Sequence, residues 1–74
     1  MIKLYFVRHQ DGASSYWKFE PVKSTTFVMC SFLSASGQLK QAFPMQATRV
    51  QPMLEAARKT ELTITLVTEP HHEI

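Results

Sequence analysis

Apolar and polar residues alternate over much of the first half of the chain, a pattern that predicts antiparallel strands. Asp11-Gly12 suits a two-residue type I′ hairpin loop, because both central positions of that turn need positive φ. In this register Phe6 faces Trp17. One face of the hairpin is then apolar, with Ile2, Leu4, Phe6, Trp17, Phe19 and Pro21. The opposite face carries the cross-strand pairs Tyr5–Lys18 and Lys3–Glu20.

Ser36-Gly37 predicts a second hairpin by the same logic, with Ala35 opposite Gln38. A longer loop would change this register. The cross-strand pairs that follow are Ser34–Leu39, Cys30–Phe43 and Val28–Met45. The apolar residues of the two strands then share one face, namely Val28, Cys30, Phe32, Leu39, Phe43 and Met45, with Gln41 as the exception opposite Phe32.

Residues 48–60 predict the only helix. Its apolar residues recur at i, i+3, i+4 and i+7, at Val50, Met53, Leu54 and Ala57. Thr48 with Gln51 resembles a capping box, and Pro52 falls in or near the first turn, where a missing N–H costs least. Residues 62–68 alternate and predict a last strand. Its inward residues are Leu62, Ile64 and Leu66, and its outward residues are Thr63, Thr65 and Val67.

The predicted order of elements is four strands, a helix and a fifth strand. A helix that runs back along the sheet delivers the fifth strand antiparallel to the first, so we place these two strands side by side. The spatial order is then 5-1-2-3-4, and the fold class is α+β, a five-stranded antiparallel sheet with one helix packed on one face. We expect a single domain over residues 1–70 and a flexible tail over residues 71–74.

Composition places the chain among folded, soluble proteins, because 45% of its residues are hydrophobic. No stretch reaches the ~18 apolar residues that a membrane span needs, and no signal-peptide pattern precedes the first strand. Cys30 is the only cysteine, which fits a reducing compartment and excludes an internal disulfide. We therefore expect a cytoplasmic protein that does not enter a membrane.

Charge is unevenly spread around a net value of +2. Residues 1–60 hold all eight Lys and Arg residues against Asp11, Glu20 and Glu55, whereas residues 61–74 hold only acidic charges. A basic body of this kind could attract an acidic protein or a nucleic acid, or could simply keep the protein soluble.

The third predicted strand is apolar on both sides, although one helix can cover only one face of the sheet. An apolar patch rimmed by charge is typical of an interaction surface. The alternative is that a loop or the C-terminal tail covers this second face. We predict a partner-binding surface on the uncovered face, formed by Tyr5, Tyr16, Phe27, Met29, Leu33, Lys3, Lys18 and Lys40.

Recognition of another protein is the leading functional hypothesis, with the apolar side chains as buried anchors and the charged rim setting orientation. The partner is either an unknown protein or a second copy in a homodimer, and by analogy alone the module would be an inhibitor or adaptor. The alternative is binding of single-stranded nucleic acid on the same face. The stacking residues would be Tyr5, Tyr16 and Phe27, with Lys3, Lys18 and Lys40 at the phosphates.

No constellation of residues predicts an enzyme, a cofactor or a metal site. Cys30 lies in the middle of an apolar strand, so a buried structural thiol is favoured over a nucleophile with His9 as its base. Adjacent side chains in His71-His72-Glu73 diverge, and no third ligand is fixed nearby. The two glycines cannot form a phosphate loop.

Overall fold

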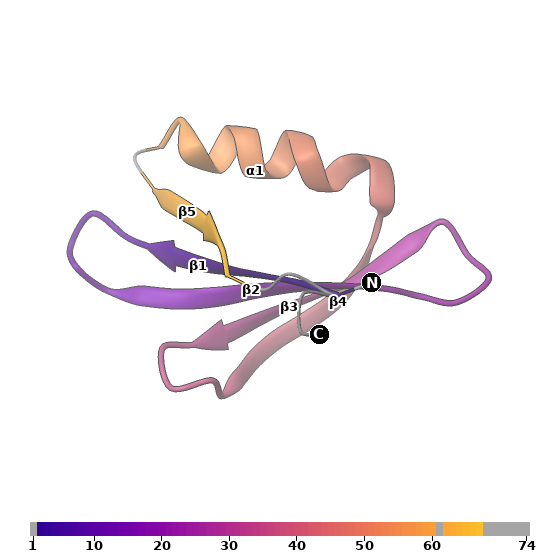
Figure 1. Ribbon diagram of the computed structural model, residues 1–74, viewed down its shortest axis with the longest axis horizontal. Helices are drawn as coiled ribbons and strands as arrows, with labels where there is room; N and C mark the ends of the chain where they lie inside the picture. The colour runs from indigo at the N-terminus through magenta and orange to yellow at the C-terminus, as the bar shows by residue number, and fades with distance from the viewer. Residues whose placement is uncertain (1, 61, 68–74) are drawn as a thin grey trace, which may run out of the picture.

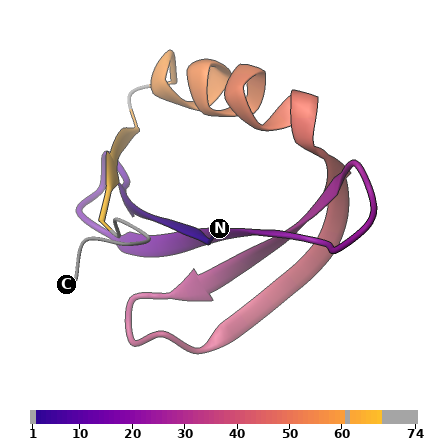
Figure 2. The ribbon, with the colours of Figure 1, turned by 45° about the vertical axis from the view of Figure 1, so that its right-hand side comes forward.

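The computed structural model describes residues 2–60 and 62–67. It contains one antiparallel sheet with the strand order β4-β3-β2-β1-β5, and a helix lies over one face of that sheet (Figures 1 and 2). This confirms the predicted fold class and strand order. The elements are β1 (Lys3–Arg8), β2 (Ser14–Pro21), β3 (Phe27–Ser34), β4 (Leu39–Gln46), the 3₁₀ helix η1 (Ala47–Arg49), α1 (Val50–Arg58) and β5 (Thr63–Leu66).

The helix begins differently from the prediction. A 3₁₀ turn precedes α1, and the Val50 N–H donates to the Ala47 carbonyl. No side chain caps the N-terminus of α1, so the capping box predicted from Thr48 and Gln51 is wrong. Pro52 does lie in the first turn. Within residues 2–60 and 62–67, no helix combines the length and the apolar character needed to cross a bilayer.

The core lies between α1 and the sheet. Leu54 of α1 is 1% exposed and belongs to one core cluster with buried residues from four strands, β1, β2, β3 and β5. The buried hydrophobic residues are Tyr5, Val7, Phe19, Cys30, Leu54 and Ile64. Half-buried residues extend this cluster, namely Trp17, Val28, Phe43, Met45, Val50, Met53, Ala57 and Leu62. The apolar stripe predicted for the helix therefore faces the sheet.

The β1–β2 hairpin has a longer loop than the type I′ turn predicted for it. The His9 N–H donates to the Ala13 carbonyl at 2.8 Å, and the Gly12 N–H donates to the His9 carbonyl at 3.0 Å. Gly12 has a φ of 93°, whereas Asp11 does not have a positive φ. These features define a three-residue loop, a type I turn followed by a left-handed glycine.

The longer loop shifts the β1–β2 register by one residue, so Phe6 pairs with Tyr16 and not with Trp17. A one-residue shift moves every side chain of a strand to the other face. Tyr5, predicted on the uncovered face, pairs with Trp17 and is only 8% exposed. Lys3 pairs with Phe19 on the same helix-covered face. The predicted positions of Tyr5 and Lys3 are therefore wrong, as are those of Ile2, Leu4 and Phe6.

The β3–β4 hairpin has the same loop but keeps most of its predicted register. The Ser34 N–H donates to the Gln38 carbonyl at 2.8 Å, and Gly37 has a φ of 91°. Leu33 pairs with Leu39, but the next pair is Phe32 with Gln41, which leaves Lys40 as an extra residue in β4. This β-bulge offsets the longer loop. The predicted pairs Cys30–Phe43, Val28–Met45 and Phe32–Gln41 are confirmed, and Leu39 alone changes face.

The last strand lies antiparallel to β1 at one edge of the sheet. Ile64 is buried and Leu62 packs against the core, as predicted, whereas Leu66 is 39% exposed. β5 is shorter than the predicted 62–68 segment. The flexible tail predicted over residues 71–74 lies outside the described residues.

Candidate partner-binding face

The sheet face opposite α1, which we call the uncovered face, carries a continuous apolar row. Phe6 of β1 pairs with Tyr16 of β2, Tyr16 pairs with Leu33 of β3, and Leu33 pairs with Leu39 of β4. Neighbouring strands lie about 4.8 Å apart, so this row extends over about 14 Å. We call Phe6, Tyr16, Leu33 and Leu39 the apolar row. Leu39 is its most exposed end, at 57%.

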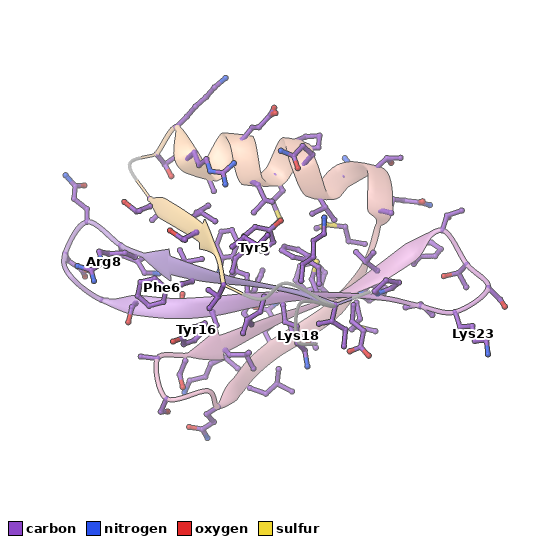
Figure 3. All side chains as sticks on the ribbon, in the orientation of Figure 1. Tyr5, Phe6, Arg8, Tyr16, Lys18 and Lys23 are labelled. Carbon is purple, nitrogen blue, oxygen red and sulfur yellow. The ribbon has the colours of Figure 1, made fainter. Side chains whose placement is uncertain are left out.

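The aromatic end of the apolar row is ordered by its own contacts. The rings of Phe6 and Tyr16 meet edge to face, with centroids 5.5 Å apart and planes at 61°. The Arg8 guanidinium lies 5.9 Å from the centre of the Phe6 ring, within the range of a cation–π contact. These three residues come from neighbouring positions of β1 and β2 (Figure 3). Both rings are half-buried, although no helix within residues 2–60 and 62–67 covers them.

Further apolar side chains widen the patch beyond the row. Leu4 pairs with Lys18, and Met29 pairs with Pro44, all on the uncovered face. Phe27 at the start of β3 is 40% exposed. Because these positions alternate with the helix-covered residues of the same strands, they follow from the register and not from a local irregularity. The apolar area therefore spans β1 to β4.

Charged residues flank the aromatic pair on both sides. Arg8 follows Phe6 by two residues, and Lys18 follows Tyr16 by two, so the two cations lie in the rows on either side of the apolar row. Glu20 is the one acidic residue in the described strands, and it lies a row beyond Lys18. The uncovered face is thus mainly apolar, with more positive than negative charge at its border.

The structure brings together only part of the predicted site. Five predicted residues lie on the uncovered face, namely Tyr16, Lys18, Phe27, Met29 and Leu33. Tyr5 and Lys3 lie on the opposite face, and Lys40 is the bulge residue of β4.

Four residues of the uncovered face were missed from the sequence, namely Leu4, Phe6, Arg8 and Leu39. Asp-Gly and Ser-Gly also fit three-residue loops with glycine in the third position. That reading of the two turns would have moved all four residues to the uncovered face, as observed.

The two residues considered for catalysis, Cys30 and His9, lie in different surroundings. Cys30 is fully buried, and its Sγ lies 3.6 Å from the Met45 Sδ. Burial raises the pKa of the Cys30 thiol, which disfavours the reactive thiolate. The His9 Nε2 lies 3.2 Å from the Ser15 Oγ. In the described part of the chain, no three His, Cys, Asp or Glu side chains gather as metal ligands would.

Comparison of the chain with protein-family models, with curated proteins and with solved structures finds no match.

Proposed function

We propose that this protein is a non-enzymatic interaction module that binds an acidic partner protein through its uncovered face. The observation that carries the proposal is the continuous apolar row across β1, β2, β3 and β4. Among the described residues, the helix lies over the other face (Figure 2). An exposed apolar surface of this extent is typical of a protein-binding site.

The aliphatic half of the apolar row favours a protein over other partners. Leu33 and Leu39 continue the row beyond the aromatic pair, and Met29 adds a flexible apolar side chain further along β3 on the same face. Complete burial of Leu39, which is 57% exposed, would contribute about 1–2 kcal/mol. Aliphatic side chains of this kind fill pockets on a protein partner, with the aromatic pair as the central anchor.

The charge at the border favours an acidic partner over a second copy of the chain. In a two-fold homodimer the same surface occurs on both sides of the interface. Arg8 and Lys18 would then face a surface whose described residues carry the same two cations and only Glu20 to pair with them. An acidic partner surface would instead pair with both cations, and such complementarity raises the rate and the specificity of association.

A single-stranded nucleic acid is the second candidate, and one observation favours it. Phe6 and Tyr16 form an aromatic pair with Arg8 on one side and Lys18 on the other. Bases can stack on exposed rings while neighbouring cations contact phosphates. The edge-to-face geometry leaves less ring area open than parallel rings would, and Leu33 and Leu39 have no role in this mode.

The proposed action is occupation of a partner's surface, as an inhibitor or an adaptor would do. We also propose that the protein works in a reducing compartment such as the cytoplasm. The support for this part is Cys30, a single thiol that the fold buries completely and leaves without a disulfide partner among the described residues.

The decisive experiment compares two single-charge variants in affinity capture followed by binding of the purified partner. Leu39→Glu places a charge in the apolar row, and Gln51→Glu places the same charge on the exposed side of α1. We expect the wild type and Gln51→Glu to bind the same acidic protein, and Leu39→Glu to lose at least about tenfold in affinity. Equal binding by all three chains would contradict the proposal.

Two further measurements distinguish the alternatives. If the wild type has a solution mass near twice 8.5 kDa and Leu39→Glu has the mass of one chain, the partner is a second copy and not another protein. Fluorescence anisotropy with a labelled oligo-dT tests the nucleic acid. Binding that weakens steeply with salt and with Tyr16→Ala, and that tolerates Leu39→Glu, would place nucleic acid first.

A further inference from the structure

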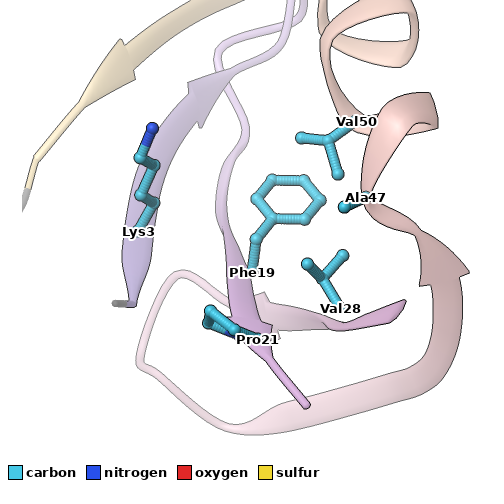
Figure 4. A pocket seen from close by; sticks show the side chains of 6 residues that line it. All are labelled: Lys3, Phe19, Pro21, Val28, Ala47 and Val50. Carbon is cyan, nitrogen blue, oxygen red and sulfur yellow. The ribbon is translucent and has the colours of Figure 1, made fainter. Parts of the chain in front are cut away.

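A pocket of about 290 Å³ opens on the helix-covered side of the sheet, away from the uncovered face. It lies between the start of β1, the end of β2 and the first turn of the helical segment (Figure 4). Its lining residues are Lys3, Phe19, Pro21, Val28, Ala47 and Val50. Phe19 is 4% exposed and lies in the middle of the lining, with Lys3 on one side of its ring and Val28, Ala47 and Val50 on the other (Figure 4).

Among the described residues that line the pocket, Lys3 is the one charged residue and none is acidic. The register explains its position, because Lys3 alternates with Leu4 and so lies on the same face as Tyr5 and Val7, which are buried. The Lys3 side chain therefore borders an apolar pocket at the point where β1 enters the core layer. Ligand pockets commonly combine an apolar lining with one or a few polar groups of this kind.

We propose that this pocket binds a small aliphatic monocarboxylate. Its hydrocarbon chain would pack against Phe19, Val28 and Val50, and its carboxylate would pair with the Lys3 ammonium. The single cation matches a single negative charge, and the apolar lining offers nothing to a polar ligand. This inference is independent of the proposed function, because the pocket and the apolar row lie on opposite faces of the sheet.

The volume limits the size of the ligand. About 290 Å³ is close to the lower end of known ligand pockets. It corresponds to the share of about ten water molecules in the liquid. A medium-chain acid such as octanoate matches that volume, whereas a nucleotide or a long-chain lipid would extend well outside the lining residues.

Titration of the full chain with octanoate, followed by amide chemical shifts in NMR spectra, tests the proposal. We expect saturable binding, with the largest shifts at the lining residues. Octylamine, which has a similar chain and the opposite charge, should bind at least about fivefold more weakly. Lys3→Gln should lower the affinity for octanoate, because it removes the ion pair with the carboxylate. The loss should be only about three- to fivefold, because the lysine is exposed and water screens the ion pair. Lys18→Gln, the same change on the uncovered face, should leave the affinity unchanged.

A second variant tests the site without changing its charge. Ala47→Phe places a ring in the pocket from an exposed position at the start of η1 and should abolish octanoate binding. Thermal unfolding of both variants checks that the fold is retained. If Ala47→Phe fails to fold, octanoate binding by Lys3→Gln tests the site. The proposal is overturned if octanoate does not saturate, if octylamine binds equally well, or if the shifts gather on the uncovered face. Loss of partner capture in Leu39→Glu with intact octanoate binding would separate the two proposals.

Discussion

The two hairpins of this sheet have the same loop but different registers. In each hairpin, a glycine with a φ near 90° closes a three-residue loop, and the N–H of the residue before the loop donates to a carbonyl four residues later at 2.8 Å. The β1–β2 strands then pair regularly. In the β3–β4 hairpin an extra residue, Lys40, restores the register that a two-residue loop would have produced.

The difference shows that a turn sequence by itself does not determine which side chains face the core. The loop sets the pairing next to it, and a single bulge further along the strand reverses the effect for every later residue. In β4 the bulge keeps Phe43 and Met45 against the core. In β1 there is no such bulge, so Tyr5 and Val7 are buried and Phe6 belongs to the uncovered face.

The largest expected difference in the free energy of unfolding is between variants at two neighbouring residues of β1. Tyr5 is buried against Phe19, with ring centroids 5.7 Å apart, whereas Phe6 contacts Tyr16 on the uncovered face. Tyr5→Ala should lower the free energy of unfolding by about 3–5 kcal/mol, because it leaves a cavity in the core. Phe6→Ala should lower it by only about 1 kcal/mol. Chemical denaturation of the two variants measures the difference.

Tyr5→Phe is the control for this pair, since it keeps the ring and should leave most of the stability intact. If Tyr5→Ala unfolds the chain completely, Tyr5→Leu gives a measurable and smaller loss. A larger loss in Phe6→Ala than in Tyr5→Ala would mean that β1 has the register of the type I′ loop, contrary to the structure.

A smaller effect is expected when the bulge itself is removed. Deletion of Lys40 would let Leu39 and Gln41 become neighbours in β4 while each keeps its partner in β3, since Leu39 pairs with Leu33 and Gln41 with Phe32. We expect the free energy of unfolding to change by less than about 1 kcal/mol, because no buried contact is lost. Deletion of Pro44, which pairs with Met29 and separates Phe43 from Met45, should unfold the protein or shift Phe43 or Met45 out of the core. Comparable losses in the two deletions would show that the bulge has a further structural role.

The smallest effect is confined to alkaline pH and tests the buried side of the second hairpin. Burial raises the pKa of the Cys30 thiol above its ordinary value of 9.0. The unfolded chain therefore loses this proton at lower pH than the folded chain does. The contribution of the protonated Cys30 thiol to the free energy of unfolding is complete below pH 9.0 and is lost as the pH rises above that value.

We accordingly expect the free energy of unfolding of the wild type to fall more steeply above pH 9.0 than that of Cys30→Ala, which has no thiol. The difference between the two curves removes the titration of tyrosine and lysine, which both chains share. Thiol labelling gives an independent check, because Cys30 should react only after denaturation. Parallel curves together with rapid labelling of the folded chain would place Cys30 outside the core.

Much of the fold follows from local features of the sequence. The order of strands and helix follows from periodicity, because a period near 3.6 in the segment of α1 and a period of 2 in the strands are properties of short segments. The strand order 5-1-2-3-4 follows from connections that are short except for the one that contains the helix. The faces of β2 and β3 also agree with the prediction, since Trp17, Phe19, Val28 and Cys30 all face the helix.

Half of the candidate binding face required the tertiary structure. β1 is apolar on both sides, with Leu4 and Phe6 on one and Tyr5 and Val7 on the other, so its alternation cannot say which pair is buried. In β1 the buried pair depends on the loop at Gly12. In β4 the residues that face the core depend on the bulge at Lys40. The side chains that are buried as a result pack in one cluster with Leu54 of α1, an interaction between segments far apart in the chain. Local periodicity therefore determined the elements, and long-range packing determined which face of β1 the protein presents to a partner.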